Sequence, residues 1–341
     1  MRPQLRTDVP LIWRTDDLLQ FGTDPKRARA VPASSEEHDW LVSLDGARGL
    51  SPALSAADVR GIEPATATGL LEALSEAGAL EDAGLDVPEL RTATVAERAR
   101  LAPDVAAVGL ALGPPGAGVR SMSARRRAKV EIRGSGRVGT AVATLLAAAG
   151  VGTIAVEECD QGEDVTPFTA GAPHSGTVRA AIERCAPSTR VLDYRRDPAP
   201  PDLVVLADRP HVDPEEVATL VAADVPHLIV HAAGSRAVIG PLVVPGRTAC
   251  LRCVYLTRRD RDATWPRQAA QLVRLPEPRA VDVLLATVAA AVAARRVCGV
   301  IERTDVLPPG AGTAVEFDMI TQRFTSRAWS PHPICGCTWS G

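Results

Sequence analysis

The sequence predicts an α/β protein: a Rossmann-like, mostly parallel sheet with a structural zinc site, preceded by a small, winged-helix-like α+β module. Three observations predict this fold class. Strands and helices alternate from Lys129 onward, which is typical of a parallel sheet covered on both faces. A glycine-rich turn, Gly134-Ser-Gly-Arg-Val-Gly139, lies between the first strand and the first helix of this part. Two close cysteine pairs follow, Cys250-Leu-Arg-Cys253 and Cys335-Gly-Cys337.

Composition and charge exclude several classes of protein. The chain has 341 residues, enough for two domains with ordinary cores. Its net charge is −3 and its aromatic content is 3%, so it has neither the basic field nor the stacking residues of a nucleic-acid-binding protein. No secretory signal opens the chain, and the longest apolar run, Val283 to Ala294, is shorter than the ~20 residues that span a bilayer. We therefore expect a cytoplasmic protein with no nucleic-acid or membrane partner.

The N-terminal segment, residues 1–85, has the pattern of a small α+β module. Short apolar runs at Pro10–Arg14 and Leu18–Gly22 indicate strands. Ser34-Ser-Glu-Glu37 is typical of a helix start, with acidic residues in the first turn. Strands followed by helices predict a winged-helix-like module.

The remaining chain divides into a linker, residues 86–128, and a larger domain, residues 129–341. In the linker, Thr94 to Ala102 indicates one helix, which Pro103 is expected to end. The strands expected in the larger domain are Val130–Arg133, Thr153–Val156, Asp202–Leu206, His227–His231 and Val238–Val244. The helices expected there are Val138–Ala149, Gly176–Cys185, Pro214–Ala223 and Val281–Val300.

The glycine turn has the setting of a nucleotide-binding loop. It follows a strand, opens a helix, and precedes a strand that ends in acids at Glu157 and Glu158. Glycines let backbone N–H groups approach a phosphate, and the helix N-terminus adds partial positive charge. The alternative is a turn that only packs the helix on the sheet. We favour nucleotide binding at Gly134, Gly136 and Gly139.

The cysteine pairs predict zinc. A Cys-x-x-Cys sequence holds two thiolates at the separation that tetrahedral Zn²⁺ requires, and a second close pair completes a four-sulfur shell. Zinc bound by Cys250, Cys253, Cys335 and Cys337 has no open position, so we expect a structural site that fastens the C-terminal tail to the fold. The alternatives are two unrelated pairs or a redox pair. The odd total of seven cysteines indicates reduced thiols and metal binding rather than disulfides.

These motifs carry a resemblance to a known family. The stretches Gly134–Gly139, Ala148-Ala-Gly-Val-Gly152 and Glu157-Glu-Cys-Asp160 resemble the opening of the ThiF/MoeB/HesA superfamily, relatives of the ubiquitin-activating enzymes. The stretch Gly240 to Cys253 resembles the strand, loop and zinc knuckle of that superfamily. Pro331-His-Pro-Ile-Cys-Gly-Cys337 resembles its second zinc pair, although the usual spacing there is Cys-x-x-Cys.

The resemblance covers residues 129–341. Within the superfamily, the chain looks most like the actinobacterial ThiF-like proteins found near genes for azole- or cyclodehydratase-type maturation of ribosomal peptides. Such proteins often carry a leader-peptide-binding module at the N-terminus, which is the role that the resemblance implies for residues 1–85.

The resemblance also implies an activity and a set of site residues. Members of the superfamily use Mg²⁺ and ATP to adenylate the C-terminal carboxylate of a peptide or small protein. Glu158 stands where their ribose-binding acid lies, with Asp160 close after it, and Asp208 stands near their Mg²⁺-coordinating aspartate. Arg179 stands where a phosphate-binding lysine is expected; it keeps the charge but offers a planar fork. Arg137, inside the turn, either adds charge at the nucleotide or is a solvated loop residue.

At two places the chain departs from the family's pattern in residues that bear on the chemistry. The stretch Asp160 to Gly171 contains no Arg or Lys, whereas relatives carry an arginine there that contacts the triphosphate, and nucleotidyl transfer depends on neutralising developing charge. No cysteine lies between Val254 and Val297, where a thioester nucleophile usually resides. A mechanism through a thioester is therefore not expected.

Three functions remain open. The first is an adenylyltransferase that binds ATP, Mg²⁺ and structural Zn²⁺, whose partners are a precursor peptide or small ubiquitin-like protein, a partner modification enzyme and a second copy in a homodimer. The second is a catalytically silent scaffold that presents a leader peptide to a separate enzyme. The third is an NAD(P)-dependent oxidoreductase, which does not account for the paired cysteines.

Other polar residues have less specific interpretations. The segment Asp260 to Gln268 is expected to be a loop, either a crossover over the site or plain surface. His211, His227 and His231 are expected to be structural. The acids around Asp213 fit the capping of a helix rather than a metal site.

Overall fold

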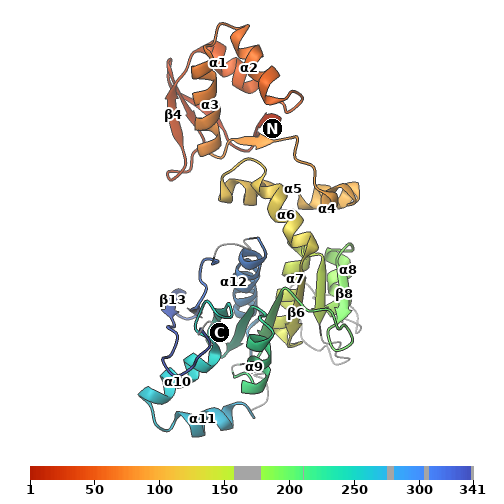
Figure 1. Cartoon of the computed structure of the whole chain (residues 1–341), viewed down its shortest axis with the longest axis vertical. Coiled ribbons are helices and arrows are strands. Elements are labelled where there is room, and N and C mark those ends of the chain that lie inside the picture. The colour runs from red at the N-terminus through yellow and green to blue at the C-terminus, as the bar shows by residue number, and fades with distance from the viewer. Residues whose placement is uncertain (157–177, 210, 275–279, 303–306, 339–341) are drawn as a thin grey trace. The chain divides into compact units, whose positions relative to one another are not determined.

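The chain folds into two units, residues 1–123 and 124–341 (Figure 1). The structure is a computed structural model that describes residues 1–156, 178–209, 211–274, 280–302 and 307–338. Each unit has its own hydrophobic core.

The N-terminal unit begins with short strands followed by three helices. Strands β2, β3 and β4 form an antiparallel sheet in that order, and β1 pairs antiparallel with β5. The bounds are β1 Pro3–Leu5, β2 Leu11–Thr15, β3 Leu18–Phe21, β4 Arg29–Pro32, α1 Ser35–Val42, α2 Leu50–Asp58, α3 Pro64–Glu76 and β5 Leu80–Asp82.

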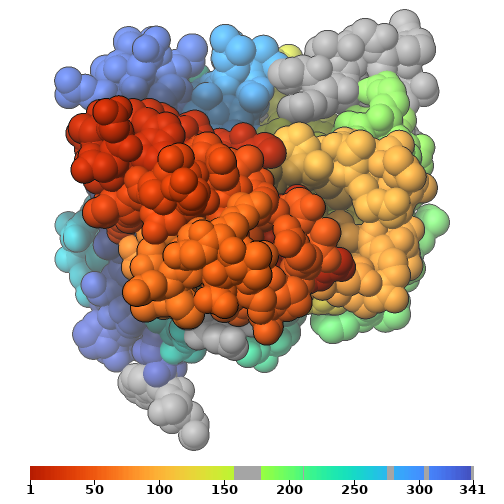
Figure 2. All heavy atoms as spheres, turned by 90° about the horizontal axis from the view of Figure 1, so that it is seen from above, coloured from red at the N-terminus to blue at the C-terminus, as the bar shows by residue number. Residues whose placement is uncertain are grey.

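Trp40 lies at the centre of this unit. Its ring is fully buried with Leu74 of α3, and its Nε1 donates a hydrogen bond to the Ala53 carbonyl at 3.1 Å. Helix α1 starts where the sequence predicts. The Ser34 hydroxyl accepts the Glu37 N–H at 3.2 Å, and the Glu37 carboxylate accepts the Ser34 N–H at 2.7 Å, which is a capping box. In the space-filling view these elements, red to orange, form one continuous surface (Figure 2).

The prediction that Pro103 ends a helix is wrong. Helix α5 runs through it, from Val95 to Leu112. Proline withholds one backbone hydrogen bond, but the alanine- and leucine-rich turns after it favour the helix, which ends at Gly113 with φ +98°. The segment predicted as a linker also holds α4, Pro88–Arg91, and α6, Ala117–Arg127.

An eight-stranded mixed sheet forms the second unit, in the order β13-β12-β11-β10-β9-β6-β7-β8. Strands β8, β7, β6, β9 and β10 are parallel to one another. Strand β11 pairs antiparallel with β10, β12 with β11, and β13 with β12. The bounds are β6 Lys129–Arg133, β7 Thr153–Val156, β8 Arg190–Asp193, β9 Leu203–Ala207, β10 His227–Ala233, β11 Arg236–Val243, β12 Thr313–Asp318 and β13 Arg323–Ala328. The α/β class and the mostly parallel sheet are confirmed.

Helices cover both faces of this sheet. On one face α7 and α12 pack on residues such as Leu228 and Val230; on the other, Leu220 of α9 packs on Val204 and Ile229. The bounds are α7 Arg137–Ala148, α8 Val178–Cys185, α9 Pro214–Ala222, α10 Leu251–Arg261, α11 Trp265–Leu272 and α12 Val283–Ile301. The segment expected to be a loop, Asp260 to Gln268, is therefore mostly helical.

Helix α12 is long and apolar enough to cross a membrane by length and composition. Its apolar residues instead belong to the core, where Leu285, Ala289, Ala293 and Val297 are buried against α7 and the sheet. The helix expected at Val281–Val300 is thus a buried core helix.

A buried ion pair fixes the C-terminal end of α12. The Glu302 carboxylate, 1% exposed, lies 2.6 Å from Nη2 of Arg125 and 2.5 Å from Nη2 of Arg295. Replacing Glu302 by glutamine leaves the buried Arg125 without its counter-charge. We expect the unfolding free energy to fall by about 3–5 kcal/mol, measured by urea denaturation. The exposed Glu316→Gln, which pairs with exposed Arg236, should cost at most ~1 kcal/mol; equal losses would contradict the argument.

Candidate nucleotide loop and cysteine cluster

The glycine turn lies at the carboxyl end of the parallel strands. Strand β6 ends at Arg133 and α7 begins at Arg137. Gly134 has φ +125°, and a Cβ added there would lie 2.4 Å from the Ala207 carbonyl oxygen. At Gly139, in the first turn of α7, a Cβ would lie 2.1 Å from the Gly134 oxygen. Larger residues are excluded at both positions, which brings loop, helix and β9 into close contact.

This loop opens where the strand order reverses. From β6 the chain proceeds outward to β7 and β8, then returns to β9 and β10 on the other side of β6. In doubly wound sheets the crevice at such a switch point is the usual ligand site. The N-terminus of α7, with the partial positive charge of its backbone N–H groups, faces this place.

Asp208 lies at the same place, directly after β9. It is 8% exposed, and its φ of +64° is in the left-handed region, where non-glycine residues are uncommon and often functional. Its carboxylate accepts the backbone N–H of Val138 at 3.0 Å and of Gly139 at 2.9 Å. A negative charge at a helix N-terminus is favourable. The structure thus brings the residue predicted to bind metal against the loop predicted to bind phosphate; this capping role was not predicted.

Of the other residues predicted to bind the nucleotide, Arg137 and Arg179 form hydrogen bonds to backbone carbonyls. The two predicted acids lie outside the described part of the chain. Nη1 of Arg137 donates to the Val281 carbonyl at 2.8 Å, and Nη1 of Arg179 donates to the Val191 carbonyl at 3.0 Å. Glu158 and Asp160, together with the stretch 160–171, lie outside the described residues. The roles of these residues stay predictions.

The four predicted zinc ligands converge. The Sγ atoms of Cys250, Cys253, Cys335 and Cys337 all lie within 4.8 Å of one another. The separations are 3.9 Å for Cys250–Cys253, 3.5 Å for Cys250–Cys335 and 3.4 Å for Cys253–Cys337. Tetrahedral Zn–S bonds of ~2.3 Å place sulfurs ~3.8 Å apart. The cluster is therefore consistent with a zinc site, and its position joins the C-terminal tail to the start of α10.

Local backbone geometry supports this arrangement. Gly336 has φ +75°, which lets the shortened Cys335-Gly-Cys337 turn direct both thiols inward. The backbone N–H of His332 donates to Cys253 Sγ at 3.2 Å. Sequence reasoning did not identify His332; its only signal is its place just before the second pair.

Burial shifts the pKa values of the four thiols. Burial raises the pKa of Cys250, Cys335 and Cys337 to about 11 each. Burial also acts to raise the pKa of Cys253, but the His332 N–H and neighbouring thiols outweigh it and lower this pKa. Metal binding must therefore displace protons from three weakly acidic thiols.

A pH dependence follows for the metal-free protein. A thiol pKa raised from 9.0 to about 11 stabilises the fold below pH 9, and this stabilisation is lost as the pH rises through 11. We expect the melting temperature of chelator-treated protein to fall between pH 9 and 11 more steeply than that of zinc-loaded protein. Parallel curves for the two forms would contradict this prediction.

The predicted structural histidines and acids have distinct environments. His227 is fully buried on β10, and its Nδ1 lies 3.0 Å from the Val225 carbonyl. Asp213 caps α9 by accepting the Glu215 N–H at 2.9 Å, which confirms the predicted capping. His211 and His231 both lie near Arg258.

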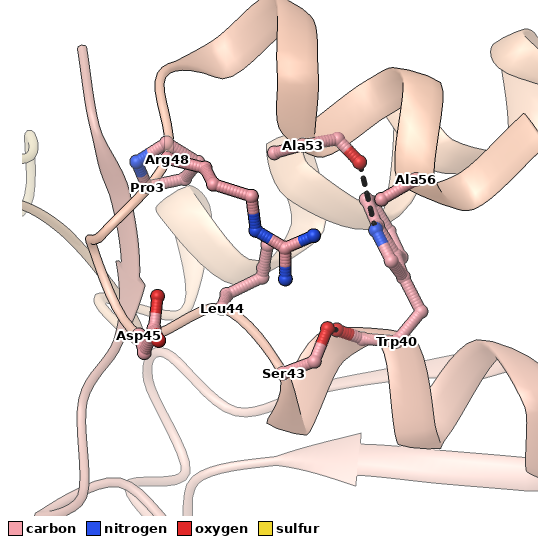
Figure 3. A pocket seen from close by; sticks show the side chains of 8 residues that line it. All are labelled: Pro3, Trp40, Ser43, Leu44, Asp45, Arg48, Ala53 and Ala56. Atoms are coloured by element: carbon pink, nitrogen blue, oxygen red, sulfur yellow. Dashed lines mark hydrogen bonds between the residues drawn. The ribbon is translucent and has the colours of Figure 1, made fainter.

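A small pocket in the N-terminal unit lacks a set of catalytic side chains. It lies beside the buried ring of Trp40, between α1 and α2, with the Arg48 side chain extending across it (Figure 3). Its other lining residues are Pro3, Ser43, Leu44, Asp45, Ala53 and Ala56. The Ser43 hydroxyl in this lining donates to the Trp40 carbonyl at 2.6 Å, and no His, Cys or Lys is among the described residues that line the pocket.

Solved structures share this fold over the whole chain. No family model matches the chain, and no curated protein matches its sequence. The structure of E. coli MccB with AMPCPP and MccA matches with a TM-score of 0.70 and 18% identity over 100% of both chains. E. coli MccB with ATP matches with a TM-score of 0.70 and 18% identity over 99% of both chains. PaaA matches with a TM-score of 0.67 and 16% identity over 95% of this chain and 99% of its own.

The chain is thus similar in fold to MccB from end to end. MccB is described as the microcin C7 biosynthetic enzyme and has been solved with N-formylated MccA. At these identities the similarity establishes the fold. It extends to the N-terminal unit, beyond the residues 129–341 on which the sequence resemblance rests.

Proposed function

We propose that the chain is an ATP-dependent adenylyltransferase that activates a carboxylate of a peptide or small protein in ribosomal-peptide maturation. The observation that carries the proposal is the contact of the Asp208 carboxylate with the first turn of α7, directly after the glycine turn, at the switch point of the sheet. The whole-chain similarity to MccB, whose structures hold ATP and MccA, supports it.

In this proposal the glycine turn and the N-terminus of α7 bind the phosphates of ATP. Glu158 and Asp160 are proposed to lie at the ribose, with Arg137 and Arg179 supplying positive charge. Asp208 is proposed to hold Mg²⁺, because its carboxylate lies at the start of α7, beside the glycine turn proposed to bind the phosphates. Bound Mg²⁺ neutralises charge on the phosphates.

The chemistry is a single displacement at phosphorus. A carboxylate oxygen of the substrate forms a bond to the α-phosphorus as the bond to the β-phosphate oxygen breaks. The products are an acyl adenylate and pyrophosphate. No proton transfer is needed, so the contribution of the protein is positioning and charge stabilisation.

The N-terminal unit is proposed to bind the leader part of the substrate. Strand β2 lies at the edge of its small sheet, and Ile12 and Trp13 on it are 37% and 39% exposed. An exposed edge strand with apolar side chains suits the addition of an extended peptide. The partners are thus a precursor peptide and the modification enzyme that acts on it, and a homodimer is the proposed assembly.

Exchange of labelled pyrophosphate into ATP tests the function. The full-length protein is incubated with Mg-ATP, labelled pyrophosphate and a precursor peptide encoded near its gene. Exchange that requires the peptide is the expected result. Binding of ATP without exchange, with peptides that do bind, would overturn the proposal.

That outcome would favour the second candidate, a silent scaffold that presents a leader peptide to another enzyme. Its specific support is the lack of Arg and Lys in residues 160–171 and the bond of Arg179 to the backbone of β8. A scaffold binds the peptide equally well with and without ATP.

A further inference from the structure

A cluster of cationic and aromatic side chains lies on the α9 face of the sheet, outside the nucleotide loop. Arg258 of α10 has its Cζ 4.8 Å from the ring centroid of Trp265 and 5.8 Å from that of Trp329. Arg327 of β13 contacts the same Trp329 ring, with its Cζ 5.6 Å from the centroid. His211 lies 6.2 Å from Trp265, centroid to centroid.

His231 connects this cluster to the candidate site. Val230 pairs with Ala207 of β9, and its carbonyl accepts the Asp208 N–H at 3.0 Å, so the next residue, His231, is beside Asp208 across the sheet. Because side chains alternate along a strand, His231 shares the α9 face with Ile229 rather than the α7 face with Val230.

The cluster holds positive charge without a negative partner. The side chains of Arg258 and Arg327 contact aromatic rings, and neither forms an ion pair or hydrogen bond to another described residue. Burial, and then repulsion from Arg327, lower the pKa of Arg258. The nearest acid on α10, Asp260, is already paired with His332 at 2.8 Å and with Arg259 at 2.9 Å.

Polar nitrogens around Arg258 are also unsatisfied. Within the described part of the chain, the indole nitrogens of Trp265 and Trp329 and Nδ1 of His231 are buried without a hydrogen-bond partner. An indole N–H is a donor only. Burial lowers the pKa of His231 to about 4 and also lowers that of His211, so both rings are neutral at pH 7. Buried donors without acceptors are rare in proteins and call for an explanation.

We infer that this cluster is the binding site for the carboxylate at the C-terminal end of the peptide substrate. With two rings against the guanidinium of Arg258, its N–H edge is the part left to form paired hydrogen bonds to a carboxylate. The indole N–H groups of Trp265 and Trp329 are the additional donors, and the neutral His231 ring supplies one more N–H in the tautomer protonated at Nδ1.

The position favours a carboxylate over the ATP phosphates. The glycine turn leads into α7, which covers one face of the sheet, whereas this cluster lies on the opposite, α9 face. A carboxylate held here lies across Asp208 from the nucleotide loop, as a second substrate must. This inference rests on the proposed function, because it names the part of the substrate that the same site selects.

Binding without turnover tests the inference. Full-length protein is immobilised and loaded with Mg²⁺ and AMPCPP, which prevents release of pyrophosphate. A mixture of short synthetic peptides of random sequence is applied, once with free C-terminal carboxylates and once as C-terminal amides, and the retained peptides are quantified by mass spectrometry. The wild type is expected to retain free acids at least roughly tenfold better than amides.

Three variants of α10 make the test specific. Arg258→Gln is expected to abolish the preference for free acids, whereas Arg261→Gln, an exposed arginine on the same helix, should keep it. Arg258→Lys keeps the charge without the fork and should retain part of the preference. The affinity for ATP should be unchanged in all three, and circular dichroism checks that each is folded.

Several outcomes would overturn the inference. A wild type without preference for free acids, or a preference that survives in Arg258→Gln, contradicts it. A tenfold loss of ATP affinity in Arg258→Gln with the peptide preference intact would assign the cluster to phosphate instead. A preference for free acids without pyrophosphate exchange would sustain the inference while the adenylation proposal fails.

Discussion

Replacing Cys253 by serine is expected to remove bound zinc from the protein and to lower its melting temperature by at least ~10 °C. Cys253 is fully buried, and its Sγ lies 3.4 Å from that of Cys337 and 3.9 Å from that of Cys250. Structural zinc contributes on the order of 10 kcal/mol to small metal-dependent folds. Loss of a third or more of that corresponds to such a shift, at ~2–4 °C per kcal/mol.

The measurement combines metal analysis with calorimetry. Purified wild type should contain one zinc per chain, and the Cys253→Ser variant almost none. A chelator should lower the melting temperature of the wild type but leave that of the variant unchanged. Cys185→Ser is the matched control, since Cys185 lies on α8 outside the cluster. Wild type without stoichiometric zinc, or equal metal content in Cys253→Ser, would show that the four thiols do not form a metal site.

The parallel part of the sheet was predictable because its strands are short, continuous apolar runs. All five residues of β9, Leu203 to Ala207, are buried, which is the pattern of a strand covered on both faces. The helices between these strands begin at recognisable residues, such as Pro214 with Asp213 before it. Local sequence therefore carried enough information for these elements.

Other elements lack such a local signal. Every residue of β13, Arg323 to Ala328, is exposed, so no apolar alternation marks it, and only its antiparallel pairing with β12 makes it a strand. Helix α10 is rich in arginine and is fixed at its start by the cysteine cluster rather than by an apolar stripe. Such elements depend on partners distant in sequence.

In the candidate site, too, the local motifs were predictable from the sequence, whereas the contacts between distant residues were not. The glycine turn and the cysteine pairs are compact motifs whose geometry is local, so the sequence identified them. The hydrogen bonds from Val138 and Gly139 to Asp208 link residues 70 and 69 positions apart. They exist because β9 pairs with β6, and no local sequence pattern predicts that pairing. The cluster around Arg258 likewise joins α10, α11, β10 and the C-terminal strand, and sequence reasoning treated its histidines as structural.

Replacing Asp208 by asparagine is expected to reduce peptide-dependent pyrophosphate exchange by a factor of about 10²–10³. Asparagine keeps the size of the side chain but removes the negative charge proposed to hold Mg²⁺. One of its two polar atoms becomes a donor, which faces the N–H of Val138 or Gly139 instead of accepting it. We therefore also expect a loss of about 1–3 kcal/mol in unfolding free energy.

Asp213→Asn is the matched control for this variant. Asp213 also caps a helix, accepting the Glu215 N–H at 2.9 Å, but has no role in the proposed chemistry. It should lose at most ~1 kcal/mol of stability and keep its exchange activity. Both variants are compared at a temperature where each is folded, so that lost activity reflects chemistry. Exchange by Asp208→Asn within tenfold of the wild type would mean that its carboxylate only caps α7. Peptide binding that persists in Asp208→Asn while exchange is lost would place Asp208 in the transfer step and not in substrate recognition.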